Sequence, residues 1–193
     1  MIDATVGILT LNSSKNIYKC LNSLNHFKEI IILDGGSIDS TLEIAKKFKC
    51  RILKQKKISK FSNKRIKNFS QVRNFILEKA KYDMVLMLDS DEVLDKSQMH
   101  KINFLSKSTI MKKKYYCFLM PRIPFFENSV FKKTNLFPNF QPRLFYKSNM
   151  KGYIKLVHET PIPINHRLKQ HKLKDIYIYF SAELTDVQIK RKF

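Results

Sequence analysis

The feature that most constrains the fold of this chain is a series of short apolar runs, each followed by a polar residue. Residues 4–11, 29–33 and 84–88 are mostly apolar and of strand length, and Asn12, Asp34 and Asp89 come directly after them. Runs of this kind are typical of strands that are buried on both faces of a parallel sheet. Because ligands bind at the carboxyl ends of strands in such sheets, the three polar residues predict a site at one sheet edge.

Segments with helical spacing lie between these runs. Their apolar residues are Ile17, Cys20, Leu21 and Leu24, then Leu42, Ala45 and Phe48, and then Val72, Phe75, Ile76 and Ala80. With a short strand at residues 51–53, this alternation predicts an α/β fold with an open, mostly parallel sheet flanked by helices. After a helix near residues 97–105, strands are predicted at residues 115–120, 143–146, 153–157 and 176–180. We therefore expect one domain, residues 1–193, with a more strand-rich C-terminal half.

The net charge of +21 is concentrated in two blocks. Residues 46–81 carry 14 basic and one acidic residue, and residues 111–193 carry 17 and 5. These blocks predict a surface that attracts a polyanion, which could be diphosphate, anionic lipid or nucleic acid. A solvated surface from a lysine-rich composition is the alternative. Residues 54–68 have no periodicity and are expected to form a basic loop.

Other bulk features exclude several classes of protein. A hydrophobic content of 44% argues against wholesale disorder. No stretch reaches the roughly 18 apolar residues of a membrane span, and the start lacks the pattern of a signal peptide, so a cytoplasmic location is expected. The three cysteines are widely spaced and predict neither a disulfide framework nor a zinc site.

The segment Asp89-Ser90-Asp91 is the strongest chemical signal. In an extended segment, residues i and i+2 project to the same side, so the two carboxylates could share one divalent cation. Mg²⁺ and Mn²⁺ prefer hard oxygen ligands and often complete their shell with substrate phosphates. A helix start with acidic caps is the alternative.

Two weaker signals accompany this pair of carboxylates. After Asp34, Gly35 and Gly36 permit a tight turn at which Asp34 could accept a hydrogen bond from a nucleobase or ribose. An ordinary strand-to-helix turn capped by Asp39 is the alternative. Arg73 is expected opposite the apolar face of its helix, where it either reaches a base or phosphate or is simply solvated. The absence of glycine-rich phosphate loops and nucleophile elbows disfavours dinucleotide oxidoreductases, P-loop enzymes and α/β-hydrolases.

Taken together, these segments resemble family 2 glycosyltransferases with the GT-A fold. The matching segments are residues 5–12, 29–41, 71–74 and 83–92. Within that family the chain is most similar to the branch that adds glucose or heptose to the lipopolysaccharide inner core. This finer similarity depends on Arg73-Asn74, on residues 88–92, on residues 142–146 and on residues 157–159.

The resemblance implies a metal-dependent enzyme that transfers a sugar from a nucleotide-sugar, expected to be UDP-linked, to a glycan or glycolipid. Residues 1–94 would bind the donor and residues 95–193 would form the acceptor side. In the donor half, Thr10, Asn12 and Asp34 would contact the nucleoside, with Arg73 nearby and Asp89 near ribose and diphosphate. Mg²⁺ or Mn²⁺ would be held by Asp91 with Asp89.

On the acceptor side, the resemblance implies that Glu159 or His158 lies near the acceptor. An inverting enzyme needs a base there to deprotonate the attacking hydroxyl. We predict Glu159 as that base, because a carboxylate adds no cationic charge near the metal. His158 could instead contact diphosphate or metal. The alternative is that both residues only cap a turn before Pro161.

Departures from the family pattern leave other functions open. Ser13 and Ser14 stand where the family often has acidic residues, and Tyr179 stands near a position at which relatives often carry His. Relatives usually continue beyond residue 193, so the acceptor side is expected to be shortened. A nucleotidyltransferase of similar architecture is the alternative enzyme, but the glycine-rich activation loop that would favour it is absent. An inactive relative or a basic nucleic-acid-binding protein is the non-enzyme alternative. No RNA-binding signature appears, so nucleic acid is not an expected partner, whereas peripheral contact with an anionic membrane through residues 46–68 is.

Overall fold

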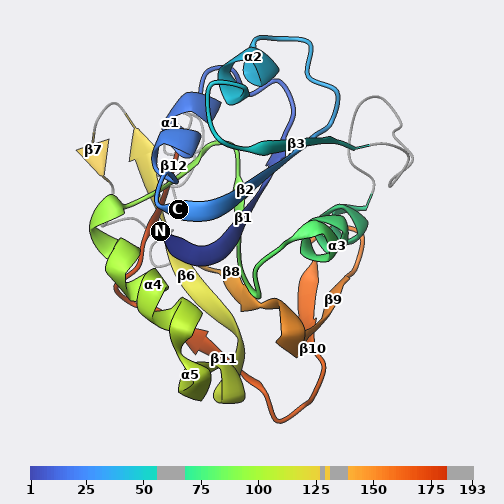
Figure 1. Ribbon diagram of the computed structural model, residues 1–193, viewed down its shortest axis with the longest axis vertical. Coiled ribbons are helices and arrows are strands. Elements are labelled where there is room, and N and C mark those ends of the chain that lie inside the picture. Colours follow the sequence, from blue (N-terminus) through green and yellow to red (C-terminus); the bar gives the residue numbers. More distant parts are fainter. Residues whose placement is uncertain (56–67, 127–128, 131–138, 182–193) are drawn as a thin grey trace, which may run out of the picture.

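The computed structural model describes residues 1–55, 68–126, 129–130 and 139–181, which form a mixed sheet with helices on both faces (Figure 1). The strands are β1 Ile2–Thr10, β2 Phe27–Asp34, β3 Arg51–Lys54, β4 Met84–Asp89, β5 Glu92–Leu94, β6 Tyr115–Phe126, β7 Ser129–Val130, β8 Asn139–Tyr146, β9 Met150–Ile154, β10 Thr160–Pro163, β11 Lys169–Lys172 and β12 Ile178–Ser181. The helices are α1 Ile17–Asn22, α2 Thr41–Ala45, α3 Phe69–Lys79, α4 Met99–Lys107 and α5 Thr109–Lys114.

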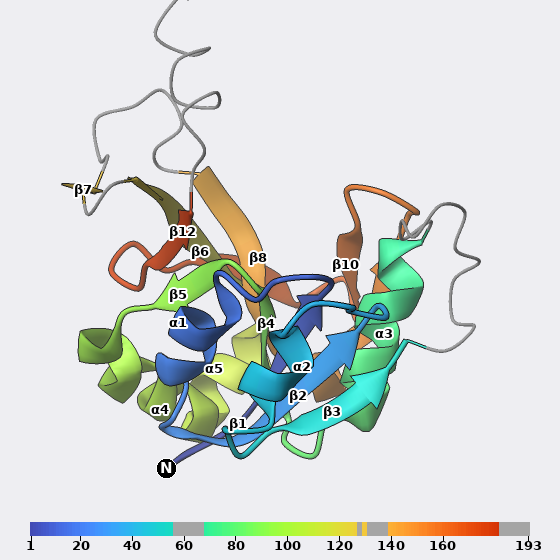
Figure 2. The same ribbon diagram turned by 90° about the horizontal axis from the view of Figure 1, so that it is seen from above.

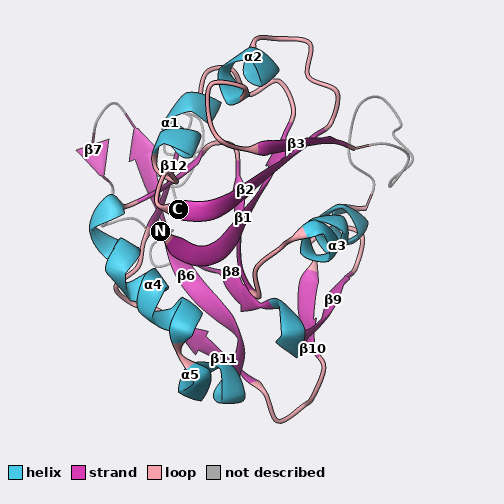
Figure 3. Cartoon of the chain, in the orientation of Figure 1, coloured by secondary structure: helices cyan, strands magenta, loops and turns pink. Residues whose placement is uncertain are grey.

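The main sheet joins a parallel first half to an antiparallel extension. Its strand order is β3-β2-β1-β4-β8-β6-β12-β5, and the neighbours among β3, β2, β1 and β4 are parallel. Strand β8 then pairs antiparallel with both β4 and β6. Figure 3 shows strands through the middle of the molecule and helices around them. The predicted open α/β sheet with a strand-rich second half is therefore confirmed.

Alternation along the central strands sorts side chains between the two faces. On β4, Met84, Leu86 and Leu88 belong to the core that contains α1 and α4, whereas Val85 and Met87 pack with α3. The same alternation continues to Asp89, which therefore points toward the α3 face. The hydrophobic core thus places the carboxylate that ends β4 beside this helix.

Gly7 of β1 allows α3 to lie close to the sheet. A Cβ at this position would lie 2.4 Å from Cγ2 of Ile76 and 3.0 Å from Sδ of Met87. Such a contact is too short for any larger side chain without displacement of the helix. Gly7 therefore sets the distance between α3 and the carboxyl ends of β1 and β4.

The second half follows the predicted strands less closely. The helix near residues 97–105 is confirmed as α4, and the strands near 115–120, 143–146 and 176–180 correspond to β6, β8 and β12. The strand predicted at residues 153–157 is wrong at its end, because β9 stops at Ile154 and Lys155 has a φ of 74°. Strands β9 and β10 form a separate antiparallel hairpin that lies beside α3 (Figure 2). Most of the predicted basic loop, residues 56–67, is outside the described residues.

Candidate active site

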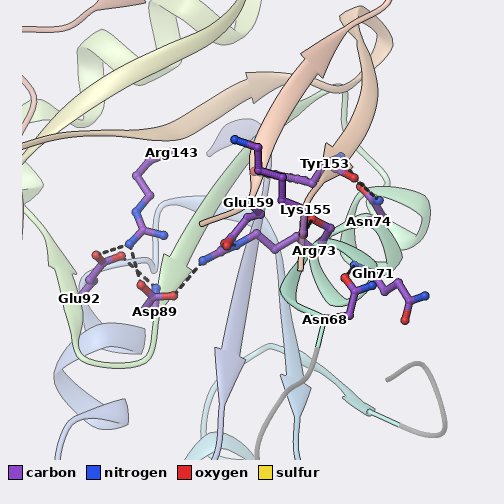
Figure 4. A network of polar contacts seen from close by, with 11 residues as sticks. Asn68, Gln71, Arg73, Asn74, Asp89, Glu92, Arg143, Tyr153, Lys155 and Glu159 are labelled. Carbon is purple, nitrogen blue, oxygen red and sulfur yellow. Dashed lines mark hydrogen bonds and ion pairs between the residues drawn. The ribbon is translucent and has the colours of Figure 1, made fainter. Parts of the chain in front are cut away.

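A cluster of alternating charges lies where β4 ends. It consists of the side chains of Arg73, Asp89, Glu92, Arg143 and Glu159, which Figure 4 shows, together with Arg122, and we call it the arginine–carboxylate cluster. Nη2 of Arg143 donates to Oδ2 of Asp89 and to Oε1 of Glu92, each at 2.6 Å. Nη2 of Arg73 lies 3.3 Å from Oδ1 of Asp89. Two arginines from opposite sides therefore hold one carboxylate at the sheet edge.

Glu92 connects the cluster to the backbone. It is fully buried, and its Oε2 accepts a hydrogen bond of 3.0 Å from the backbone N–H of Asp89. Nε of Arg122 lies 2.6 Å from Oε1 of Glu92. No role was predicted for Glu92, Arg122 or Arg143. Each is a charged residue beside apolar residues of a strand, and such a residue is rarely buried without a partner, so this pattern could have indicated a buried ion pair.

Charge and burial oppose each other in this cluster. Burial pushes the pKa of Asp89 upward, but Arg143 and Arg73 outweigh burial and hold that pKa well below its usual range. For Glu92, burial outweighs the attraction of Arg143, so its pKa is raised. The arginines therefore favour the charged form of Asp89 in particular.

Arg73 was predicted opposite the apolar face of its helix, where it would either reach a base or phosphate or be solvated, and the solvated alternative is wrong. Its side chain is buried, and its Nε donates to Oε1 of Glu159. The reason is that α3 is covered on both sides, by the sheet and by the β9–β10 hairpin. The helical pattern alone could reveal only the sheet-facing side.

The hairpin is fastened to α3 by hydrogen bonds to its backbone. The side chain of Asn74 donates to the carbonyl of Tyr153 at 3.0 Å and accepts from its N–H at 2.7 Å, as a neighbouring strand would. The N–H of Phe69 donates to the carbonyl of Leu156 at 2.9 Å, and the hydroxyl of Ser70 donates to the backbone carbonyl of Lys155. These bonds fix the loop that carries His158 and Glu159.

The geometry of that loop differs from the expected strand. His158 has a φ of 54° and is exposed, whereas Glu159 is half-buried and turned toward Arg73. Left-handed backbone in residues other than glycine costs energy and is concentrated at functional sites. His158 and Glu159 therefore follow a turn and not a continuing strand, and both residues line the same cavity.

A second group of contacts, which we call the loop network, joins the turns after β1 and β2. Asp34 is buried, and its carboxylate accepts from the N–H of Gly36 at 2.9 Å and from the hydroxyl of Ser37 at 2.5 Å. Asn12 accepts from the N–H of Ile38 at 2.9 Å. The loop network thus orders the turns in which Asn12 and Asp34 were predicted to bind a nucleoside.

The outer part of the loop network is built by Asp39 and the serines that depart from the family pattern. The N–H of Ser14 donates to Asp39 at 3.0 Å, and the N–H of Ser13 donates to the hydroxyl of Thr41 at 2.7 Å. The hydroxyls of Ser13 and Ser90 lie 2.7 Å apart. Ser13 therefore joins the loop network to the turn between the two predicted metal ligands.

Asp89-Ser90-Asp91 is not an extended segment, contrary to the prediction. Asp89 ends β4, and Ser90 and Asp91 form a turn before β5. The pKa of Asp91 is raised, first by burial and then by the charge of Asp89. Among the described residues, Asp91 has no cationic partner, whereas Asp89 has two. Asp91 is therefore a half-buried carboxylate that an added cation would stabilise.

The residues present fit a metal ion that is bound only in part by protein. No group of three or more potential metal-binding side chains occurs in the described ranges. Asp91, which has no ion pair among the described residues, is the carboxylate open to Mg²⁺ or Mn²⁺, whereas both oxygens of Asp89 are bound by arginines, so such an ion would take most of its ligands from phosphate and water.

A cavity of about 480 Å³ opens beside the cluster. It is lined by Phe69, Arg73, Asp89, Gln141, Pro142, Arg143, Tyr153, Val157, His158 and Glu159. Four predicted site residues, Arg73, Asp89, His158 and Glu159, therefore line one cavity. Asn12 and Asp34 belong to the loop network, Thr10 lies at the end of β1, and Asp91 lies in the turn after β4. Oγ1 of Thr10, Nη1 of Arg73 and the hydroxyl of Tyr153 are buried without a partner in the described part of the chain. Unpaired buried polar groups of this kind are rare in folded proteins and call for a partner.

The fold and the site define an α/β domain with a charged site at the carboxyl ends of its parallel strands, and comparison with known proteins identifies the family. The family model described as glycosyl transferase family 2 matches residues 5–161. The chain therefore belongs to glycosyl transferase family 2.

Individual relatives agree with this assignment. The SPbeta prophage-derived glycosyltransferase SunS of Bacillus subtilis is 30% identical over 180 residues, which are 92% of this chain and 39% of SunS. An uncharacterized glycosyltransferase of Haemophilus influenzae is 32% identical over 99 residues, which are 51% of this chain and 38% of that protein. The chain thus spans about two fifths of the length of these relatives.

Solved structures show the same fold. TarS 1-349 of S. aureus in complex with UDP-GlcNAc superposes with a TM-score of 0.62 and 18% identity, covering 94% of this chain and 59% of TarS 1-349. At this identity the likeness shows the fold alone, and it confirms the predicted GT-A architecture. No helix among the described residues is long and apolar enough to cross a membrane.

Proposed function

We propose that this chain binds a UDP-linked sugar at the carboxyl ends of β1, β2 and β4 and transfers the sugar to an acceptor hydroxyl. The single observation that carries the proposal is Asp89, which two buried arginines hold at the wall of a cavity of about 480 Å³ beside Asp91, a carboxylate without an ion pair among the described residues. Membership of glycosyl transferase family 2 supports a glycosyl donor. The shared fold of TarS, whose structure contains UDP-GlcNAc, supports uridine.

In this proposal the loop network receives the nucleoside. Thr10 contributes a buried hydroxyl without a partner among the described residues, and Asn12 and Asp34 order the two turns. The carboxylate of Asp34 already accepts from its own turn, so it contacts the base with a remaining lone pair. Arg73 lines the cavity and contributes positive charge for the diphosphate.

Asp91, with Asp89, would hold Mg²⁺ or Mn²⁺. When bound, such an ion neutralises charge on a leaving diphosphate. Arg73 and Arg143 keep Asp89 ionised and fix its orientation, and the burial of Asp91 makes a bound cation favourable. Two protein carboxylates leave most of the shell open, so we expect weak metal binding unless a nucleoside diphosphate is present.

Glu159 is the proposed base on the acceptor side. It lines the cavity together with Asp89, and its contact with Arg73 fixes its orientation. Proton removal by a positioned carboxylate would activate the acceptor for attack with inversion. His158, exposed at the rim of the same cavity, is the second candidate.

We propose a glycan or glycolipid acceptor at the cell surface, with lipopolysaccharide as the specific case that the resemblance suggests. A cytoplasmic enzyme with peripheral contact at the inner face of the membrane would suit such an acceptor. The contact predicted for residues 46–68 falls largely on residues 56–67, which are outside the described residues.

Turnover of a panel of nucleotide-sugars with Mn²⁺ or Mg²⁺ tests the proposal. We expect UDP-sugars to be used, activity to be lost in EDTA, and Asp91→Asn to be inactive with an unchanged melting temperature. Asp95→Asn, which changes a nearby carboxylate that caps a turn, is the matched control and should remain active. Undiminished activity in EDTA would remove the metal from the account, and transfer of a nucleotide instead of a sugar would favour a nucleotidyltransferase.

The base is tested by Glu159→Gln and His158→Ala. Glutamine keeps a hydrogen-bond acceptor for Arg73, so donor binding should persist while the rate of transfer falls about 10²–10⁴-fold. His158→Ala should remain active. Inactive His158→Ala with active Glu159→Gln would reverse the assignment.

A further inference from the structure

The tip of the β9–β10 hairpin exposes apolar side chains beside the cavity. Ile154, Leu156 and Val157 are 50%, 60% and 56% exposed. Val157 also lines the cavity, so the apolar surface continues to its mouth. Adjacent exposed aliphatic side chains mark a surface that binds something, whereas isolated ones need no explanation.

The backbone holds these side chains outward. The carbonyls of Lys155 and Leu156 accept hydrogen bonds from the first residues of α3, and Asn74 fixes Tyr153 from the next turn of the helix. Lys155 adopts a φ of 74° in this arrangement. The exposure of Leu156 is therefore a property of a fixed turn.

The charge around the tip indicates what it binds. Residues 150–169 contain four lysines and arginines, two histidines and a single carboxylate, Glu159, which is turned inward to Arg73. Lys151 and Lys155 are exposed and have no acidic partner within the described ranges. A surface of this kind suits an anionic bilayer, because aliphatic side chains enter the membrane interface and lysines contact the anionic headgroups.

We propose that the β9–β10 hairpin, through Ile154, Leu156 and Lys155 at its tip and Lys151 near the start of β9, binds the surface of an anionic lipid bilayer and holds the mouth of the cavity against it. The lipid contact rests on the proposed function in one respect only, which is that the cavity brought to the bilayer is taken to be the sugar-transfer site. The contact would let the site reach an acceptor that remains in the membrane.

A second surface provides the comparison for a test. Helices α4 and α5 lie away from the β9–β10 hairpin (Figure 2), and their Phe104 and Ile110 are 67% and 66% exposed among lysines. There, Lys101 and Lys112 are ion-paired with Asp175 and Asp83, whereas Lys107, Lys113 and Lys114 are exposed. Because this surface is also basic and apolar but contributes no residue to the lining of the cavity, it tests whether vesicle binding is specific to the hairpin.

Vesicle sedimentation tests the proposal. It compares vesicles of phosphatidylcholine alone with vesicles in which part of the phosphatidylcholine is replaced by phosphatidylserine. Wild type should bind the anionic vesicles, and Ile154→Ser/Leu156→Ser should bind about tenfold more weakly because two aliphatic side chains leave the interface. Lys151→Gln/Lys155→Gln should also bind about tenfold or more weakly, since each lysine near an anionic surface contributes about fivefold. Phe104→Ser/Ile110→Ser should bind as wild type does, and all variants should keep the wild-type melting temperature.

Binding of the Ile154→Ser/Leu156→Ser variant at wild-type strength would overturn the proposal, as would equal loss in the Phe104→Ser/Ile110→Ser control. Absence of wild-type binding at low salt, or equal binding to neutral vesicles, would overturn it as well. If the hairpin variant binds vesicles normally but loses transfer to a soluble glycan acceptor, the tip contacts the acceptor instead of the bilayer. Vesicle binding without turnover of any nucleotide-sugar would contradict the proposed function and leave the lipid contact intact.

Discussion

The arginine–carboxylate cluster and the loop network lie side by side at the same sheet edge but are held together differently. In the cluster, guanidinium groups with little exposure join Asp89, Glu92 and Glu159 across segments that are far apart in the chain. In the loop network, Asp34 and Asp39 accept hydrogen bonds from hydroxyls and backbone N–H groups of neighbouring turns. Removal of one member should therefore leave an unpaired buried charge in the first case and only a lost hydrogen bond in the second.

The largest effect is expected for Arg143→Gln. This change removes the cation that Asp89 and Glu92 share and leaves two neighbouring carboxylates without it, and breaking a buried ion pair typically costs about 3–5 kcal/mol. Urea unfolding should show that loss of the free energy of unfolding. Glu78→Gln removes a carboxylate that pairs with Lys79 on the exposed side of α3, and it should change stability by less than about 1 kcal/mol. Equal effects of the two changes would abolish the distinction between buried cluster and surface pair.

An intermediate effect is expected for Ser37→Ala in the loop network. The change removes the hydroxyl that donates to Asp34 at 2.5 Å, and one lost hydrogen bond should cost about 1 kcal/mol. Ser40 precedes α2 without a side-chain capping bond, so Ser40→Ala is the matched control and should be nearly neutral. If Ser37→Ala cost as much as Arg143→Gln, the loop network would be as tightly coupled as the cluster.

The smallest effect is expected at Asp39 and depends on pH. The hydroxyl of Thr41 and the N–H groups of Ser14 and Thr41 lower the pKa of Asp39 in the folded protein. Its stabilising contribution is therefore complete above the unfolded pKa of about 3.9 and is lost as the pH falls toward the lower folded pKa. The stability difference between wild type and Asp39→Asn should be constant near neutral pH and shrink below about pH 4. A difference that grows on acidification would contradict the sign of this shift.

The sequence predicted the parallel half well because its strands are buried on both faces. Their apolar runs stand out, and Asp34 and Asp89 follow them at the strand ends. The burial of Arg73 could not be predicted, because it depends on Glu159, 86 residues further along the chain. The end of β9 at Ile154 likewise depends on hydrogen bonds from Phe69 and Ser70 to the following turn. Local patterns carry no information about such long-range contacts.

The pairing of Glu92 with Arg143 was missed for the same reason, although each residue belonged to a segment that resembled the family. They are 51 residues apart, and only the antiparallel pairing of β8 with β4 brings them together. A buried charge in an apolar strand shows that a partner must exist but does not identify it.

The central claim is that a nucleoside diphosphate binds where the loop network meets the cluster, with Asp91 completing the site through a metal ion. Calorimetric titration of UDP into wild type and Asp91→Asn, each with and without Mn²⁺, tests it most directly. The account predicts that Mn²⁺ strengthens UDP binding by wild type, and that Asp91→Asn keeps the metal-free affinity but loses this gain. Absence of UDP binding by wild type, or an equal gain with Mn²⁺ in Asp91→Asn, would contradict it.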